Sequence, residues 1–127
     1  MDNNDGTFSF NGRLRSSVHA MAGILEILKS QHNAWVHLVA TLAVLAAGYV
    51  FGVDTTQWCF LILVIMAVWV AEALNTAFEL LCDVASPEFH PLVKKSKDVA
   101  AGAVLLSAVG AAAVGAIIFL PYLLAYW

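Results

Sequence analysis

Charged residues are scarce in this sequence of 127 residues, and their scarcity argues against a soluble protein. Only 12% of the residues are charged, whereas 61% are hydrophobic. A soluble domain usually carries charge on roughly a quarter of its residues. The chain is long enough for one small domain or for about three membrane helices, since each crossing takes about 20 residues. The composition therefore predicts an integral membrane protein.

Motifs of several common protein classes are absent as well. Neither Cys59 nor Cys82 belongs to a CxxC pattern, and we interpret both as buried thiols in apolar surroundings. The formal net charge of −3 gives no basic field that would indicate a nucleic-acid partner. No apolar signal-peptide core is apparent in residues 1–15. The sequence also lacks the GxxxxGK[ST] motif and the kinase HRD and DFG signatures, so a nucleotide enzyme would need a different construction.

Three long apolar runs follow a mixed N-terminal segment. We expect residues 1–12 to be disordered and residues 13–30 to form an amphipathic helix on the bilayer surface, because apolar and charged side chains alternate there. The predicted membrane spans are residues 35–53, 58–82 and 99–127. The predicted fold class is all-α integral membrane: an N-terminal surface helix and three transmembrane helices in one domain, residues 13–127.

The basic residues predict how the chain is oriented. All six lie before the first span or between the second and third, and Lys and Arg favour the cytoplasmic side of a membrane. The N-terminus and the loop at 84–97, whose prolines we interpret as helix stops, are therefore expected inside. A GxxxG pattern at Gly48 and Gly52 favours close helix packing, within one chain or between chains. Because three helices enclose little interior, we expect a homo-oligomer.

A polar stripe interrupts the second apolar run, in the stretch AEALNTAFELLCD. Its members are Glu72, Asn75, Glu79 and Asp83. At helical spacing they fall within about 80° on one face and rise about 16 Å from end to end. The first and third predicted spans contain no Lys or Arg, so ordinary ion pairing is the less favoured interpretation. Mg²⁺, which prefers carboxylate oxygens and substrate phosphates, would neutralise the stripe.

Further polar residues lie near this stripe. Lys97 and Asp98 open the third span at the depth of Asp83. In isolation, Asp98 could cap the helix and Lys97 could extend to the interface. Beside an acidic stripe we favour a lysine that binds phosphate and a carboxylate that supports a metal. His32 and His37 are five residues apart and do not share a helix face, so we interpret them as solvated or hydrogen-bonded histidines.

The pattern ExxNxxxExxxD, followed by SPEFHP and by KSKD, resembles the small bacterial integral-membrane diacylglycerol kinases. The stretch SPEFHPLVKKSKDVAAGAVLLSA is most similar to their undecaprenol-kinase branch, and the resemblance covers about residues 10–121. It implies a homotrimer in the bacterial inner membrane, with active sites shared between subunits at the cytoplasmic face. The implied reaction transfers the γ-phosphate of MgATP to a lipid hydroxyl, either of undecaprenol or of diacylglycerol.

The resemblance also implies roles for single residues. Glu72 would be the general base that accepts the lipid hydroxyl proton, Asn75 would help to order the catalytic site, and Glu79 would hold the metal. The residues implied to form the ATP site are His19, Glu79, Asp83, Glu88, Phe89, His90, Lys97 and Asp98. At His19 the family usually has tyrosine.

One position departs from the family pattern. A second metal-holding glutamate belongs to a family stretch like E-x-N-F-R-I-H, but here the stretch reads QHNAWVH, so Gln31 takes the place of that ligand. An amide is a weaker Mg²⁺ ligand than a carboxylate. This leaves open looser metal binding, recruitment of His32 or Glu26 as the ligand, a different substrate, a catalytically impaired relative or an engineered Glu→Gln change. The alternative from another class is a small ion- or proton-linked transport subunit, in which Glu72 would bind the ion. Dependence on ATP separates it from a kinase.

Overall fold

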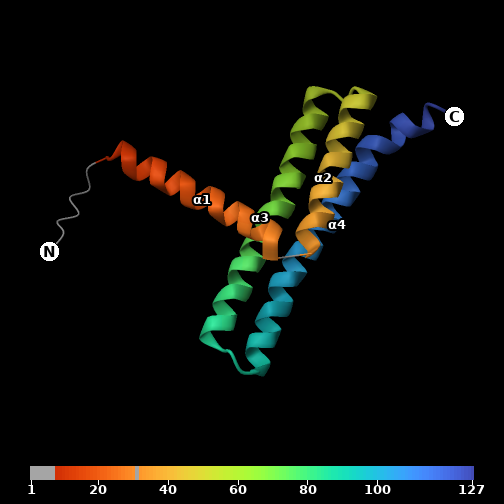
Figure 1. The fold of residues 1–127 in the computed structure, drawn as a ribbon. Helices are drawn as coiled ribbons and strands as arrows, with labels where there is room; N and C mark the ends of the chain where they lie inside the picture. The colour runs from red at the N-terminus through yellow and green to blue at the C-terminus, as the bar shows by residue number, and fades with distance from the viewer. Residues whose placement is uncertain (1–7, 31) are drawn as a thin grey trace.

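The computed structural model describes residues 8–30 and 32–127, and within these the chain forms four helices (Figure 1). They are α1 (Phe10–Ser30), α2 (His32–Phe51), α3 (Thr55–Ala85) and α4 (Pro91–Leu124). Helices α2, α3 and α4 lie side by side, whereas α1 projects away from them (Figure 1). In the described part of the chain, α2, α3 and α4 are long and apolar enough to cross a membrane. The all-α fold class with three candidate spans is therefore confirmed.

The helices extend beyond the predicted elements. Residues 1–7 of the segment predicted to be disordered lie outside the described residues, but residues 10–12 belong to the first turn of α1. Helix α4 begins at Pro91, well before residue 99, because the first turn of a helix tolerates proline without losing a hydrogen bond. The backbone N–H of Leu92 donates to Nδ1 of the capping residue His90 at 3.2 Å. The interpretation of the loop prolines as helix stops is therefore wrong for Pro91.

Hydrogen bonds close the turn between α2 and α3. Gly52 ends α2 with φ +63°, a left-handed conformation that favours glycine. The Gln57 N–H donates to Oδ1 of Asp54 at 2.8 Å, and the Asp54 N–H donates to Oε1 of Gln57 at 3.0 Å, so the two residues form a capping box. From α4, the hydroxyl of Tyr122 donates to the same Gln57 oxygen at 2.7 Å. These contacts tie α4 to the start of α3, and we call this region the turn end of the bundle.

The hydrophobic core lies at the turn end. Its buried members are Val53, Leu61 and Ile118. The ring of Phe51 stacks on Tyr122 with a centroid distance of 5.8 Å. Gly48 lies against the indole of Trp58, so that a Cβ at this glycine would be 2.6 Å from the indole Cη2. Gly48 therefore permits close packing within one chain.

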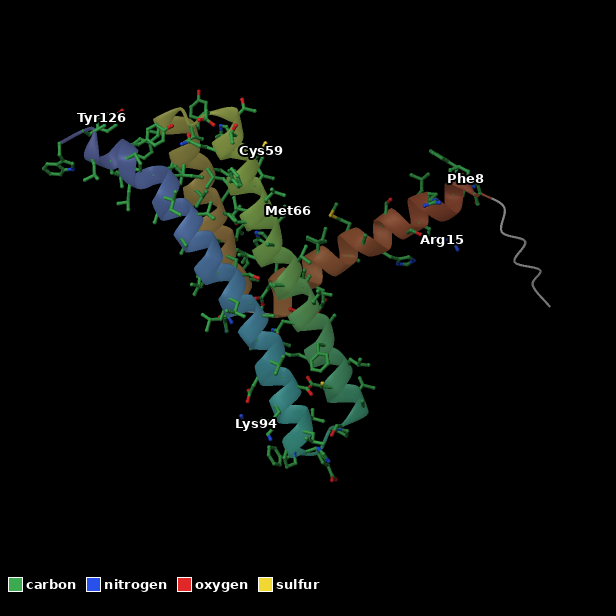
Figure 2. The ribbon with its side chains drawn as sticks, turned by 180° about the vertical axis from the view of Figure 1, so that it is seen from behind. Phe8, Arg15, Cys59, Met66, Lys94 and Tyr126 are labelled. Carbon is green, nitrogen blue, oxygen red and sulfur yellow. The ribbon has the colours of Figure 1, made fainter. Side chains whose placement is uncertain are left out.

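Elsewhere, many large apolar side chains are exposed on the outer faces of the helices (Figure 2). Such faces are expected where helices contact lipid or another chain, since apolar side chains need not be buried inside a membrane protein. Cys82 is buried as expected, whereas Cys59 is exposed, so the interpretation of Cys59 as a buried thiol is wrong.

Candidate active site

The polar stripe of α3 runs from the interior of the bundle to its surface. Glu72 is 1% exposed and Asn75 is 7% exposed. Glu79 is half-buried, and Asp83 is exposed. This gradient arises because α2 lies alongside only the N-terminal part of α3, whereas the C-terminal part of α3 has α4 beside it without α2 (Figure 1).

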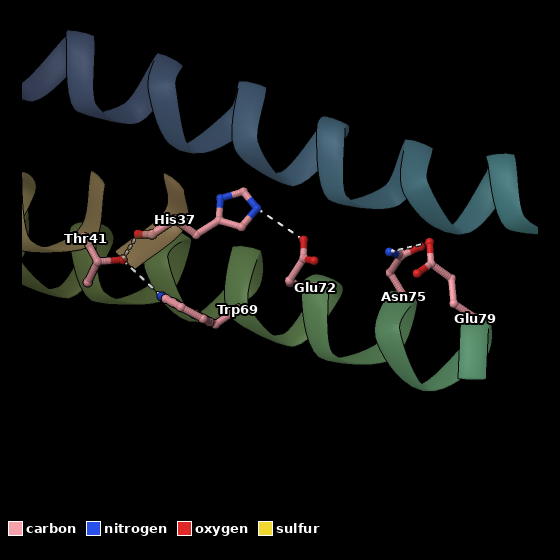
Figure 3. Close-up of polar contacts among 6 residues, drawn as sticks. All are labelled: His37, Thr41, Trp69, Glu72, Asn75 and Glu79. Carbon is pink, nitrogen blue, oxygen red and sulfur yellow. Dashed lines mark hydrogen bonds and ion pairs between the residues drawn. The ribbon is translucent and has the colours of Figure 1, made fainter. Parts of the chain in front are cut away.

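His37 of α2 contacts the buried carboxylate. Its Nε2 lies 3.2 Å from Oε2 of Glu72 (Figure 3). The other oxygen of Glu72, Oε1, is buried and has no hydrogen-bond partner among the described residues. Buried polar atoms in proteins are nearly always paired, because an unpaired one loses its hydration without compensation. The free Oε1 is therefore a position at which a donor from a substrate can bind.

A pocket of about 210 Å³ lies beside this carboxylate, and we call it the base pocket. Asn33, Val36, His37, Glu72 and Asn75 line it from α2 and α3, and Ala101, Val104, Leu105 and Ala108 line it from α4. The side-chain amide of Asn75 donates to Oε1 of Glu79 at 3.5 Å, and the Asn75 Oδ1 has no partner within the described part of the chain. The pocket thus combines a polar wall with an apolar one, which suits a hydroxyl group attached to a hydrocarbon chain.

A second pocket, the loop pocket, has a volume of about 240 Å³ and lies where α3 passes into α4. Its lining residues are Asp83, Ser86, Pro87, Glu88, Phe89, His90, Val93, Lys94 and Lys97. Lys97 Nζ donates to Oδ1 of Asp83 at 2.7 Å, in a partly exposed ion pair. A solvent-exposed pair of this kind contributes little to stability, because water and salt screen it. An anionic ligand can therefore replace Asp83 as the partner of Lys97 at little cost.

These contacts correct one argument from the sequence. Ordinary ion pairing was the less favoured interpretation of the stripe, but Lys97, which the sequence places at the depth of Asp83, forms an ion pair with that carboxylate. Glu72 likewise has an imidazole partner in His37. Ordinary pairing thus accounts for part of the stripe, and the unpaired atoms remain at its buried end.

The structure does not bring all of the predicted site residues together. Asp98 pairs with Lys94 at 2.7 Å, four residues away on α4, and does not line the loop pocket. His19 is exposed on α1, the helix that projects from the bundle (Figure 1). Gln31 lies outside the described residues. Across residues 8–30 and 32–127, no group of three or more His, Cys, Asp or Glu side chains is placed to hold a metal ion.

Comparison with known proteins identifies the family. The model of the prokaryotic diacylglycerol kinase family matches residues 18–119. The chain belongs to this family. It is 38% identical to the undecaprenol kinase of Bacillus subtilis over 97% of its own length and 100% of that relative. It is 36% identical to the diacylglycerol kinase of Synechocystis sp., over 84% of this chain and 61% of the relative.

A diacylglycerol kinase of Helicobacter pylori is also 36% identical, over 54% of this chain and 53% of that protein. The prediction of a lipid kinase is thus confirmed at the level of the family, and with it ATP as the phosphate donor that a kinase uses. Family membership favours this interpretation over the ion-linked transport subunit.

His37 is hydrogen-bonded, as expected, but sequence reasoning did not identify Glu72 as its partner. The indole Nε1 of Trp69 donates to Oγ1 of Thr41 at 3.0 Å, and that hydroxyl donates to the backbone carbonyl of His37 at 2.7 Å (Figure 3). One signal could have found this arrangement. An ionisable side chain inside an apolar span is costly, so its partner is worth seeking on the neighbouring helix.

Proposed function

We propose that this lipid kinase phosphorylates undecaprenol at the cytoplasmic face of a bacterial inner membrane. The observation that carries the proposal is the buried Glu72, which has one oxygen against His37 and the other unpaired beside a pocket with an apolar wall. Undecaprenol has one hydroxyl on a hydrocarbon chain, which matches these two walls. Diacylglycerol also has two ester groups, for which the alanine, valine and leucine side chains of α4 offer no hydrogen-bond donor. The full-length similarity to an undecaprenol kinase supports the same choice.

In this proposal Glu72 is the general base. Its Oε1 accepts the proton of the lipid hydroxyl while the hydroxyl oxygen bonds to the γ-phosphorus of ATP and the bond to the departing ADP breaks. Asn75, next to the base in the same pocket, orders the reacting groups through its unpaired Oδ1 and its amide. Phosphoryl transfer depends mostly on positioning and on charge stabilisation, which is the chemistry that such a pocket can supply.

The loop pocket is the proposed ATP site. Lys97 would exchange Asp83 for the phosphates, and Asp98 would leave Lys94 to contact the nucleotide from the same turn. The remaining residues of the proposed ATP site are Glu79, Glu88, Phe89 and His90. Magnesium fits the donor set, because in nucleotide sites it is commonly held by one or two carboxylates together with phosphate oxygens. Glu79 would supply the carboxylate and Gln31 a weaker amide ligand, and the bound ion would offset the phosphate charge.

We also propose a homotrimer with the N-terminus and the α3–α4 loop in the cytoplasm. The six basic residues lie on the segments assigned to that side. Large apolar side chains cover the outer faces of a single chain, which suits packing against further copies as well as lipid. His19 extends away from its own bundle on α1, so it would contribute to the ATP site of a neighbouring subunit (Figure 1).

Transfer of labelled phosphate from MgATP tests the proposal. The purified chain is assayed in mixed micelles that contain undecaprenol or diacylglycerol, beside Glu72→Gln and the matched control Asp54→Asn, an acid-to-amide change at the capping residue of α3. We expect transfer to undecaprenol that Glu72→Gln abolishes and Asp54→Asn retains. Preferred transfer to diacylglycerol would refute the substrate assignment but not the kinase.

The glutamine at position 31, where the family pattern has glutamate, needs a separate experiment. If the chain transfers phosphate to neither lipid, Gln31→Glu restores a carboxylate at that position. Activity gained by this variant would show an intact site weakened at its metal ligand. Silence of both proteins would refute the proposed reaction.

A further inference from the structure

We infer that His37 is a positioning residue for the catalytic base: its imidazole holds one oxygen of Glu72 so that the other stays free for the lipid hydroxyl. The inference rests on the proposed function, since it gives His37 a task in that reaction. It concerns orientation of the carboxylate, because no contact places His37 on the reacting atoms themselves.

The contact fixes which atoms do what. The two side chains are 14% and 1% exposed, and they meet through Nε2 of His37 and Oε2 of Glu72 at 3.2 Å. The proposed base is a carboxylate that only accepts hydrogen bonds, so in this proposal Nε2 of His37 is the donor. With Oε2 occupied in this way, the carboxylate cannot turn without breaking a buried hydrogen bond. The proton acceptor left over is Oε1, which has no partner within the described residues.

The backbone and the ring of His37 both contact α3 through Trp69, the backbone by way of Thr41. The hydroxyl of Thr41 donates to the backbone carbonyl of His37 at 2.7 Å, and the indole N–H of Trp69 donates to that hydroxyl at 3.0 Å. The edge of the His37 ring also meets Trp69, with centroids 6.2 Å apart and an interplanar angle of 70°. Trp69 lies three residues before Glu72, on the same side of α3. The turn of α2 that carries the imidazole is thereby fixed to the turn of α3 that carries the base.

A purely structural ion pair would have a different form. A pair that only joined α2 to α3 would be expected to satisfy both carboxylate oxygens, because an unpaired buried oxygen weakens the fold. Here the pair satisfies one oxygen and leaves the second beside the base pocket, in which Glu72 and His37 are the titratable lining residues. The arrangement thus orients the base at the expense of stability.

Three substitutions at His37 separate orientation from packing. His37→Leu fills similar space without a donor, His37→Gln places an amide nitrogen near the position of Nε2, and His37→Asn is too short to reach Oε2. We expect His37→Leu to lower kcat by about 10- to 100-fold, the range for a lost hydrogen bond to a charged group. The KM for ATP should not change, because the proposed ATP contacts lie in the loop pocket. His37→Gln should restore much of the rate, and His37→Asn should not.

Several outcomes would overturn the inference. They are a wild-type kcat in His37→Leu, an equal rate in the Gln and Asn variants, or a rise in the KM for ATP that alone explains the lost activity. If His37→Leu does not fold, Thr41→Val and Thr41→Ser decide the matter, because only the first removes the hydroxyl between Trp69 and His37. We expect Thr41→Val to lower kcat by up to about tenfold and Thr41→Ser to retain the wild-type kcat. Equal kcat values in these two variants would contradict the inference.

The parent reaction is tested in the same assay. Absence of transfer by both wild type and Gln31→Glu, or persistence of transfer in Glu72→Gln, would refute the proposed function itself. Loss in Glu72→Gln with full activity in both His37→Leu and Thr41→Val would refute the role of His37 alone.

Discussion

The turn end of the helical bundle and the middle of α3, around Glu72, differ in how their polar groups are paired. At the turn end, Asp54, Gln57 and Tyr122 satisfy one another beside a small aromatic core. Around Glu72, three buried side-chain atoms have no partner among the described residues: Glu72 Oε1, Asn75 Oδ1 and Thr76 Oγ1. An unsatisfied buried group costs about 1–3 kcal/mol. We infer that the paired groups of the turn end stabilise the bundle. The unpaired atoms around Glu72 lower its stability, and in the proposed function Glu72 and Asn75 use theirs to bind substrate.

Glu72→Gln should give the largest effect and bear most directly on this comparison. We expect phosphate transfer to fall by about 10²- to 10⁴-fold, the usual contribution of a general base. The thermal unfolding temperature in the same micelles should stay equal or rise, because a neutral amide is less costly to bury than a carboxylate. Initial rates and unfolding measured on one preparation check both parts. A rate within tenfold of wild type would contradict the role of the base.

Gly48→Ala breaks the turn end instead. The added Cβ would lie 2.6 Å from the indole Cη2 of Trp58, so the two helices must separate or the indole must move. We expect a loss of about 1–3 kcal/mol in the free energy of unfolding, as for other overpacked cores, with unchanged kcat for the folded fraction.

Gly110→Ala is the matched control for Gly48→Ala. Nothing within the described structure lies within 4 Å of a Cβ at Gly110, so this change should leave stability equal or raise it, since alanine favours the helix. Denaturation of both variants in detergent compares them. Equal losses at the two glycines would show that the packing on Trp58 contributes nothing.

Lys97→Met tests the loop pocket, where polar groups are paired but exposed. We expect the KM for ATP to rise about tenfold, which corresponds to one lost phosphate contact. The free energy of unfolding should change little, because the ion pair with Asp83 is exposed and screened by solvent. Lys95→Met removes the same charge from a residue that does not line the loop pocket. If both variants raise KM equally, Lys97 acts only through its general charge.

The sequence predicts the fold well where the information is local. The length of the apolar runs alone predicts the three candidate spans. The spacing of the polar residues of α3 alone predicts that they share one face of the helix. The start of α4 was mispredicted because the effect of a proline depends on its place in the helix: Pro91 is tolerated in the first turn, whereas Pro121 lies inside α4.

The pairings at the site depend on non-local geometry. The contact between His37 and Glu72 requires a particular rotation of α2 against α3, and no spacing within either helix encodes it. The sequence places Lys97 at the depth of Asp83, but the 2.7 Å contact between the two side chains depends on how α4 lies against α3. Similarly, the GxxxG pattern indicated a close approach at Gly48, but the partner, Trp58, lies beyond the next turn.

The smallest expected effects on stability come from removing one hydroxyl at the turn end and one near Glu72. Tyr122→Phe removes a donor to Gln57 Oε1, which still accepts the Asp54 N–H, so we expect a loss of about 0.5–1.5 kcal/mol in the free energy of unfolding. Thr76→Val removes a buried hydroxyl that has no partner in the described residues while keeping the side-chain shape, so stability should stay equal or increase. Paired unfolding curves in one detergent measure both. If Thr76→Val loses as much free energy of unfolding as Tyr122→Phe, the Thr76 hydroxyl has a hydrogen-bond partner in the assembled protein. The contrast between the turn end and the region around Glu72 would then rest on Glu72 and Asn75 alone.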